Sequence, residues 1–559
     1  MSNLHFYDKK ERPWPNQRLD RSAIVGHTTT TTTRLWVRTK NEGRHFIVFA
    51  AENTDGLPEN GFKGLEGEPV VSDGGDKFKY KKDGADKTLD LRFAEEINSS
   101  FDTDNTSVVN VTGLDADSRY HYAVIMMGRD GAPNEWELGH ESSLSFKTLP
   151  DAPVAFTFGL YSCHMPYPSD FGEAGFEARM WNVFKEELAY SDARFVIGGG
   201  DQVYADGNDK MSVWNWLERV RDDNPTDDDM VSWYRDIYRG YWGIGALQSI
   251  HRSFPNYMIW DDHEIMDGWG SYTPDELSQK MDTLSRKEDE EENNRLAHRM
   301  KNAATRVYTE YQHSHNPPTD EGVFDYPFTA CGCDFYVLDM RGYRTFKKGG
   351  KHNILGKPQY ERFGAWAQAL DDSPNKGPIF VVSPVPTVHL KDFVSNILDW
   401  LAIFGARDDV RDHWEHNAHT QEYIDFMNAC FDASQRTKRP LVFLSGDVHV
   451  GTIFKLGKKT HPDAKVYQVT SSAITYAALN DRSRAALGKA VKSEGEIKKN
   501  KMKTGIIYRR YFTYVQNNIA IFDVRMNGKG TTNLYVNIVG MDNDTGVTES
   551  KRVDLLKLV

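Results

Sequence analysis

The feature that most constrains this sequence is the stretch FVIGGGDQVYADG at residues 195–207. Its short apolar run is typical of a buried strand, and the glycines that follow break the strand into a turn. The turn places Asp201 and Tyr204 beyond the carboxyl end of the strand, where ligands gather in open α/β sheets. Because glycine has no side chain, a metal ion or a phosphate can approach the backbone at this turn. An ordinary strand and turn with a capping aspartate is the alternative interpretation of this stretch alone.

The length and charge of the chain limit the kinds of partner that it can have. With 559 residues it is too long for one simple core, so two or more structural units are expected. The formal net charge of −13 disfavours non-specific binding to nucleic acid or to an anionic membrane. An anionic substrate would therefore need a local positive site, which bound metal ions supply. The sequence leaves the oligomeric state open.

No apolar run in the sequence approaches the length of a transmembrane helix. The N-terminal residues also lack the apolar segment of a signal peptide. We therefore expect a cytoplasmic protein, or an extracytoplasmic one if a leader has been removed. The four cysteines are too few for a disulfide framework, and Cys331 and Cys333 alternate within an apolar segment, which favours buried thiols over a zinc site.

Residues 24–150 have the pattern of an all-β unit, after an N-terminal extension at residues 1–23. An apolar residue before a polar turn is followed by Tyr120 and Tyr122 on one strand, which resembles the tyrosine corner of fibronectin-type and immunoglobulin-like sandwiches. The polar residues 72–87 are expected to form a loop between strands. This unit carries no candidate catalytic group, so we expect it to have a structural or docking role.

From residue 151 to residue 559 the pattern changes to apolar runs that alternate with helical segments, as in α/β proteins. The highly charged residues 275–312 predict helix, with Met300 and Val307 among the inward-facing positions. The lysine-rich residues 489–503 are expected to form an exposed loop, and we do not interpret this basic patch as a nucleic-acid site.

Four strands of this second unit end in residues that can bind a metal ion. The first ends at Cys163, the second at Asp201 and Tyr204, the third at Asp262 and His263, and the fourth at Asp447 and His449. Acids that cluster together repel one another unless a cation neutralises them, so four such strand ends are hard to explain by packing alone. Carboxylate and phenolate oxygens with one imidazole and one thiolate suit a trivalent iron beside a divalent ion.

With these motifs the chain resembles the PhoD-like phosphatases, a branch of the calcineurin-like metallophosphoesterases. The matching segments are SC at residues 162–163, GDQVY at 200–204, DDHE at 261–264 and GDVH at 446–449, with support from LDMR at 338–341 and DGWGSY at 267–272. The resemblance covers most of the chain, because family members also carry an N-terminal β-sandwich. It implies an α/β core of two mixed β-sheets flanked by helices, preceded by an all-β immunoglobulin-like or fibronectin-like domain.

The resemblance also implies a role for each strand-end residue. Asp201 would bridge two metal ions. The other ligands would be Cys163, Tyr204 and His449 at a ferric (Fe3+) site, and Asp262 and Asp447 at a second site that often holds calcium (Ca2+), with Zn2+, Mn2+ or Mg2+ as alternatives. His263 would lie beside the phosphate as an electrostatic partner or general acid. His164 stands where many relatives have glutamine, and a hydrogen-bonded histidine is favoured there over a ligand.

The chemistry that the resemblance implies is hydrolysis of a phosphate ester by a metal-activated water. Two cations roughly 3.5–4 Å apart clamp the phosphate and stabilise the leaving oxygen, so no serine or cysteine nucleophile is needed. Phosphomonoesters are the expected substrates, and phosphodiesters cleaved on the same metals are an alternative. A third hypothesis is an inactive catalytic unit whose β-sandwich binds a partner, but the intact set of ligands argues against it.

Other polar residues lie where loops approach the expected cleft. Arg341 and Arg344 are candidates for a bidentate contact with phosphate, although pairing of Arg341 with Asp339 or with a strand end is the favoured interpretation. His389 and residues 412–414 are expected on loops beside the cleft, without a direct role.

Overall fold

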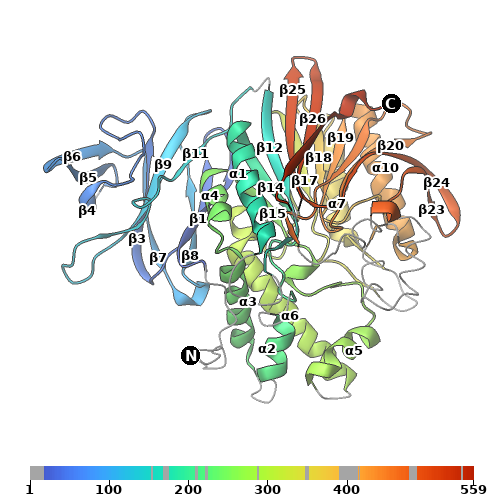
Figure 1. Ribbon diagram of the computed structural model, residues 1–559, viewed down its shortest axis with the longest axis horizontal. Coiled ribbons are helices and arrows are strands. Elements are labelled where there is room, and N and C mark those ends of the chain that lie inside the picture. Colours follow the sequence, from blue (N-terminus) through green and yellow to red (C-terminus); the bar gives the residue numbers. More distant parts are fainter. Residues whose placement is uncertain are drawn as a thin grey trace.

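The computed structural model places two groups of sheets at opposite ends of the protein. It describes residues 18–72, 74–152, 155–167, 175–207, 212–220, 225–285, 289–346, 352–389, 413–414, 416–476, 488–542 and 545–559. The N-terminal strands form one end of the molecule and the larger sheets of the C-terminal part form the other (Figure 1). Helices lie between these two groups and in a cluster below them (Figure 1).

The N-terminal part is built from antiparallel sheets. Its strands are β1 (Ser22–Thr28), β2 (Thr33–Arg38), β3 (Gly43–Ala51), β4 (Glu66–Val71), β5 (Lys77–Lys82), β6 (Ala85–Asp90), β7 (Phe93–Ser99), β8 (Thr106–Val111), β9 (Arg119–Met126), β10 (Glu135–Leu138) and β11 (Ser145–Lys147). One sheet has the order β1-β2-β8, and a second has the order β10-β9-β3-β7 with β11 paired to β9. A small third sheet, β4-β5-β6, lies at the outer end (Figure 1). The first two sheets share one apolar core, as the sheets of a β-sandwich do.

The tyrosine corner predicted at Tyr120 is present. Its hydroxyl accepts a hydrogen bond from the Asp115 N–H at 2.8 Å and donates one to the Asp115 carboxylate at 3.1 Å. The prediction of a loop at residues 72–87 is wrong, because this stretch forms β5 and the start of β6. Phe78 and Tyr80 alternate with lysines along β5 and pack into a small apolar cluster. The polar composition of the stretch therefore concealed a strand with one buried face.

The C-terminal part contains the two mixed sheets that the family resemblance implied. Its main strands are β12 (Ala155–Tyr161), β14 (Ala193–Gly199), β15 (Asn256–Ile259), β16 (Tyr326–Ala330), β17 (Cys333–Val337), β18 (Ile379–Val382), β19 (Leu441–Ser445), β20 (Gly451–Lys458), β21 (Val466–Thr470), β23 (Glu494–Lys499), β24 (Met502–Tyr514), β25 (Asn517–Asn527), β26 (Gly530–Met541) and β27 (Thr548–Asp554). One sheet has the order β15-β14-β12-β25-β26-β27, and the other has the order β16-β17-β18-β19-β21-β20-β24-β23. Two short strands, β13 (His164–Met165) and β22 (Thr475–Tyr476), pair in parallel beside them.

The two sheets pack against each other through aromatic rings. The ring of Phe158 on β12 lies 5.2 Å from that of Phe380 on β18 in the other sheet, and 4.7 Å from that of Phe522 on β25, measured between centroids. All three side chains are fully buried in one apolar cluster. Burial between the sheets and their covering helices explains why these strands appear in the sequence as continuous apolar runs.

Helices cover the outer faces of both sheets. On one side, α1 (Met180–Tyr190) packs on β14 and β25, and α4 (Gly245–Ser253) lies between α1 and the N-terminal strand β1. On the other side, α7 (Gly356–Ala369) and α10 (Thr420–Thr437) share an apolar cluster with the larger sheet.

A helical cluster lies below the sheets in Figure 1. It consists of α2 (Val213–Val220), α3 (Asp227–Tyr241), α5 (Pro274–Ser285) and α6 (Glu290–Tyr311). The helix predicted at residues 275–312 is therefore confirmed as α5 and α6, and both Met300 and Val307 are fully buried. Over the part of the chain that the structure describes, no helix combines the length and the apolar character needed to cross a membrane.

The prediction of an exposed loop at residues 489–503 is wrong. In this stretch β23 pairs with β24 and forms the edge of the larger sheet. Lys499 is buried, and its ammonium donates to the carbonyl oxygens of Trp414 at 2.6 Å and His416 at 3.0 Å. The same ammonium lies 4.5 Å from the ring centroid of Tyr423. A lysine count alone does not reveal such burial, because the long apolar stem of lysine packs readily against protein.

A buried interface joins the N-terminal sheets to the C-terminal part. The ring of Trp36 on β2 contacts the rings of Trp242 and Tyr311, and its indole N–H donates to the Glu310 carbonyl oxygen at 2.8 Å. One apolar cluster continues from Trp36 into the C-terminal sheets. The boundary near residue 150 falls between β11 and β12 and stays a prediction.

The four cysteines are free and buried, which confirms the buried thiols expected at Cys331 and Cys333. These two residues lie at the tight turn between β16 and β17. Cys163 lies elsewhere, beyond the end of β12 and next to Asp201, another of the predicted metal ligands.

Candidate metal centre

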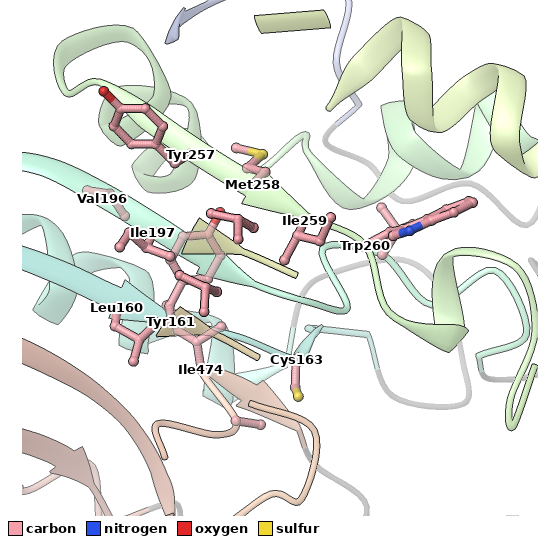
Figure 2. Close-up of a cluster of buried hydrophobic side chains, with 14 of the residues drawn as sticks. Leu160, Tyr161, Cys163, Val196, Ile197, Tyr257, Met258, Ile259, Trp260 and Ile474 are labelled. Carbon is pink, nitrogen blue, oxygen red and sulfur yellow. The ribbon is translucent and has the colours of Figure 1, made fainter. Parts of the chain in front are cut away.

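The candidate site lies at the carboxyl ends of parallel strands. β12 pairs in parallel with β14, and β14 with β15, so the residues that follow these strands share one edge of the sheet. Figure 2 shows Cys163 and Trp260 beyond the strand ends, while Leu160 and Ile197 lie within the sheet. Asp262 follows Trp260 by two residues. The sheet topology therefore brings together residues that are far apart in the sequence.

The turns at these strand ends hold non-glycine residues in the left-handed backbone region. The φ angles are 57° at Cys163, 54° at Asp201, 65° at Asp447 and 52° at His449. Such a conformation costs roughly 1–2 kcal/mol for each residue, and residues of this kind gather at functional sites. The Cys163 N–H donates to the Gly200 carbonyl oxygen at 3.2 Å, which ties the turns after β12 and β14 together.

Cys163, Tyr204 and His449 gather around the carboxylate of Asp201. Asp201 Oδ2 lies 3.3 Å from Cys163 Sγ and 3.4 Å from Tyr204 Oη. Tyr204 Oη lies 3.1 Å from His449 Nε2. Burial lowers the pKa of His449 to about 3, so its imidazole is neutral and has a lone pair for a metal ion. The structure thus brings together the side chains that were predicted to form the ferric site.

A second group consists of four carboxylates. Oxygen atoms of Asp201, Asp261, Asp262 and Asp447 lie within 4.8 Å of one another. Burial raises the pKa of Asp201 well above its ordinary value; His263 opposes this rise, and the neighbouring carboxylates add to it. Among the described residues, no group donates a hydrogen bond to Asp201 Oδ1, although this oxygen is buried. Buried carboxylates that share a site need cationic partners, so this donor set fits metal ions.

Arg341 is a fully buried cation within this acidic group. Its guanidinium pairs with Asp261, and its Nη2 lies 3.3 Å from Asp262 Oδ1. The favoured interpretation, a pair with Asp339 or with a strand end, is confirmed, because the guanidinium pairs with the strand-end aspartates. The backbone N–H of Arg341 also donates to Asp339 Oδ1, at 2.9 Å. A guanidinium with no exposed surface does not reach a substrate, so Arg341 orients the two strand-end aspartates.

Asp206, which was not among the predicted site residues, hydrogen-bonds with the predicted catalytic residue His263. Asp206 Oδ1 lies 2.8 Å from His263 Nδ1, and the other carboxylate oxygen accepts the Asp267 N–H. The His263 ring stacks on that of Tyr204 at 4.1 Å between centroids. Burial alone would lower the pKa of His263, but Asp206 and the neighbouring carboxylates outweigh burial and raise that pKa well above its ordinary value. The sequence did indicate that Asp206 lies near the site, because this residue follows Asp201 in the same turn.

Residues 471–476 support the site from outside the recognised motifs. Ser472 Oγ accepts the N–H of His449 at 2.9 Å and lies 3.1 Å from Cys163 Sγ. The ring of Tyr476 packs on that of His449 at 3.7 Å between centroids. This segment cannot be recognised in the sequence, because two serines after a strand have no spacing that distinguishes them.

His164 is the hydrogen-bonded histidine that was favoured over a ligand. Its Nδ1 lies 2.9 Å from Thr475 Oγ1, and its Nε2 lies 3.0 Å from the Tyr241 carbonyl oxygen. Burial lowers the pKa of His164 to about 4, so the ring is neutral. Both ring nitrogens have hydrogen-bond partners, which makes His164 a part of the protein framework.

The other polar candidates are buried as well. Arg344 packs so closely on Gly270 that a Cβ atom at this glycine would lie 2.7 Å from Arg344 Cδ. His389 stacks on His413 at 5.6 Å between ring centroids. Asp412 lies outside the described residues.

The family of this chain follows from a comparison of its sequence with protein-family models. The model of PhoD-like phosphatases matches residues 158–526, which is more than half of the chain. The chain therefore belongs to the PhoD-like phosphatase family, as its motifs indicated. All of the predicted ligands lie within the matched residues.

A solved structure described as "Structure of PhoD" has the same fold. Its TM-score is 0.59 at 15% sequence identity, over 95% of this chain and 88% of that chain, so the shared fold includes the N-terminal sheets. The uncharacterized protein YGR266W of Saccharomyces cerevisiae is 22% identical over an alignment 369 residues long, which covers 54% of this chain and 50% of that protein. The chain thus spans about half the length of this curated relative.

Proposed function

We propose that this protein hydrolyses phosphate esters at a metal centre of two cations. One observation carries the proposal: buried carboxylates converge with a thiol, a phenol and a neutral imidazole, and Arg341 balances only part of their charge. The proposed ligands are Cys163, Asp201, Tyr204, Asp262, Asp447 and His449. Membership of the PhoD-like family supports the assignment of phosphate esters as the substrate class.

The chemistry of the ligands supports a different metal at each site. Cys163, Tyr204 and His449 offer a thiolate, a phenolate and an imidazole, which suit ferric iron. Asp262 and Asp447 offer only hard oxygen atoms, which suit calcium, with zinc, manganese or magnesium as alternatives. Asp201 would contribute to both sites, because its Oδ2 lies beside Cys163 and Tyr204 and its other oxygen accepts no hydrogen bond from the described residues.

When bound, the two cations supply positive charge to the phosphate oxygens and lower the pKa of water. The chain contributes His263 as the proton donor to the leaving oxygen. Asp206 is the hydrogen-bond partner of His263 Nδ1, so Nε2 is the ring nitrogen that remains for the substrate. The negative charge of Asp206 also favours the protonated form of the ring, which a general acid requires. Cys163 is fully buried, so its thiol does not act as a nucleophile.

The test is hydrolysis by the purified protein together with its metal content. A phosphomonoester and a phosphodiester of the same alcohol decide which ester class is cleaved, and we expect the monoester to react faster. Asp201→Asn should retain the fold but lose nearly all hydrolysis, because a neutral amide cannot serve two cations.

The matched control for this variant is Asp372→Asn, which makes the same change at an exposed aspartate. It should keep wild-type hydrolysis and wild-type metal content. Near-normal turnover by a folded Asp201→Asn protein would contradict the two-cation centre. A wild type that holds its metals but cleaves neither ester would favour the inactive binding protein.

A further inference from the structure

A hydroxyl group lies between two of the proposed metal ligands. Ser472 follows β21 and reaches both Cys163, beyond β12, and His449, beyond β19. We propose that Ser472 is a positioning residue whose hydroxyl donates a hydrogen bond to the Cys163 sulfur and thereby tunes the metal ion bound there. This inference rests on the proposed metal centre.

The direction of the hydrogen bond follows from counting protons at Ser472. The backbone N–H of His449 can only donate, so Ser472 Oγ is the acceptor of the 2.9 Å contact. The hydroxyl keeps its own proton for a second partner. Cys163 Sγ lies 3.1 Å from Ser472 Oγ, which is within reach of a hydrogen bond to sulfur.

The other neighbours of the sulfur do not compete for this role. Ser162 Oγ lies 3.3 Å from Cys163 Sγ, but its proton goes to the Ser471 carbonyl oxygen, which can only accept, at 2.9 Å. Asp201 Oδ2, at 3.3 Å, accepts the thiol proton when no metal is bound. The Tyr204 hydroxyl also hydrogen-bonds with Cys163, but as a proposed ligand it would lose its proton when the metal ion binds. Once a metal ion replaces the thiol proton, the Ser472 hydroxyl is therefore the donor that remains for the thiolate among the described residues.

A hydrogen-bond donor to a sulfur ligand shifts the reduction potential of the metal ion in a known direction. Hydrogen bonds to sulfur draw electron density away from the metal and raise its reduction potential. Loss of the Ser472 hydroxyl should therefore favour ferric iron and move the sulfur-to-iron absorption band to longer wavelength. Ser472 also joins the turns after β12 and β19, so its loss should weaken metal binding by about 10–100-fold, as for other partners of metal ligands.

The experiment compares Ser472→Ala with Ser471→Ala, which removes a hydroxyl from the neighbouring buried residue. The Ser471 hydroxyl contacts the Leu160 carbonyl oxygen at 3.4 Å and not the sulfur. Competition with a chelator should show weaker metal binding in Ser472→Ala only, and the absorption band should shift only there. Ser472→Thr, which keeps a hydroxyl, should restore both properties. Equal metal binding in the two alanine variants would overturn the proposal.

A second measurement uses the metal-free protein, so that it does not depend on the proposed function. Unfolding free energies of Ser472→Ala, Cys163→Ala and the double variant form a double-mutant cycle. If the hydroxyl donates to the sulfur, the double variant should lose less stability than the sum of the single variants. Strict additivity would refute the hydrogen bond. A wild type that binds no metal would refute the proposed function, and the cycle would still decide the role of Ser472.

Discussion

Replacement of Asp206 by asparagine should separate proton donation from metal chemistry. The carboxylate of Asp206 accepts two hydrogen bonds, from His263 Nδ1 at 2.8 Å and from the Asp267 N–H. Asparagine has the same shape but only one acceptor oxygen, so one of these two donors must face an NH2 group. If that donor is His263, the ring takes the other tautomer and also loses the negative charge that keeps it protonated.

The size of the effect depends on how much the leaving group needs a proton. General acid catalysis contributes about 10²–10⁴-fold to a rate, which is about 3–5 kcal/mol of barrier. An alkyl phosphate has a poor leaving group, so Asp206→Asn should lower its kcat by about 10²–10³-fold. A nitrophenyl phosphate leaves as a stable phenolate, so its kcat should fall by less than about tenfold.

The assay is steady-state hydrolysis of both esters by wild type, Asp206→Asn, His263→Ala and the double variant. Because Asp206 acts through His263, the double variant should be no slower than His263→Ala. Metal content should stay at the wild-type level in Asp206→Asn. An equal loss for the two esters, or an additive loss in the double variant, would refute the assignment of Asp206 and His263 as a proton-donating pair.

Three further outcomes are expected. Removal of the metals with a chelator should abolish hydrolysis, and metal ions added back should restore it, whereas persistent activity in metal-free protein would exclude the proposed centre. Tyr204→Phe keeps the ring that stacks on His263 but removes the phenolate, so the visible absorption band of the wild type should fade or shift. A wild type that is colourless and iron-free, yet fully active with zinc alone, would contradict the ferric site. Acid should destabilise the fold below about pH 6.5, because burial lowers the pKa of His27 and His313 to about 4 and that of His315 to about 3. The native state then binds fewer protons than the unfolded state, so each histidine lowers the free energy of unfolding by about 2 kcal/mol at about pH 5. Equal free energies of unfolding in urea at about pH 7 and at about pH 5 would contradict this prediction.

Much of the candidate site was visible in the sequence because its signals are local. The glycines before Asp201 mark a turn after an apolar run, and the same pattern recurs before Asp447. The helices at residues 275–312 and the corner at Tyr120 were also predicted, since each depends on residues a few positions apart. Composition was the weaker guide: it concealed the strand that holds Phe78 because outward-facing lysines outnumber its buried residues.

Only the tertiary structure decided which partners hold the proposed ligands. Arg341 pairs with Asp261 across 80 residues of sequence, and no periodicity or spacing specifies such a pair. Ser472 reaches Cys163 across 309 residues, because β21 and β12 lie in different sheets whose ends meet at one edge. Strand order and the packing of the sheets determine these contacts. Short motifs in the sequence therefore predict the donor atoms, and the assembly of the whole fold selects the groups that orient them.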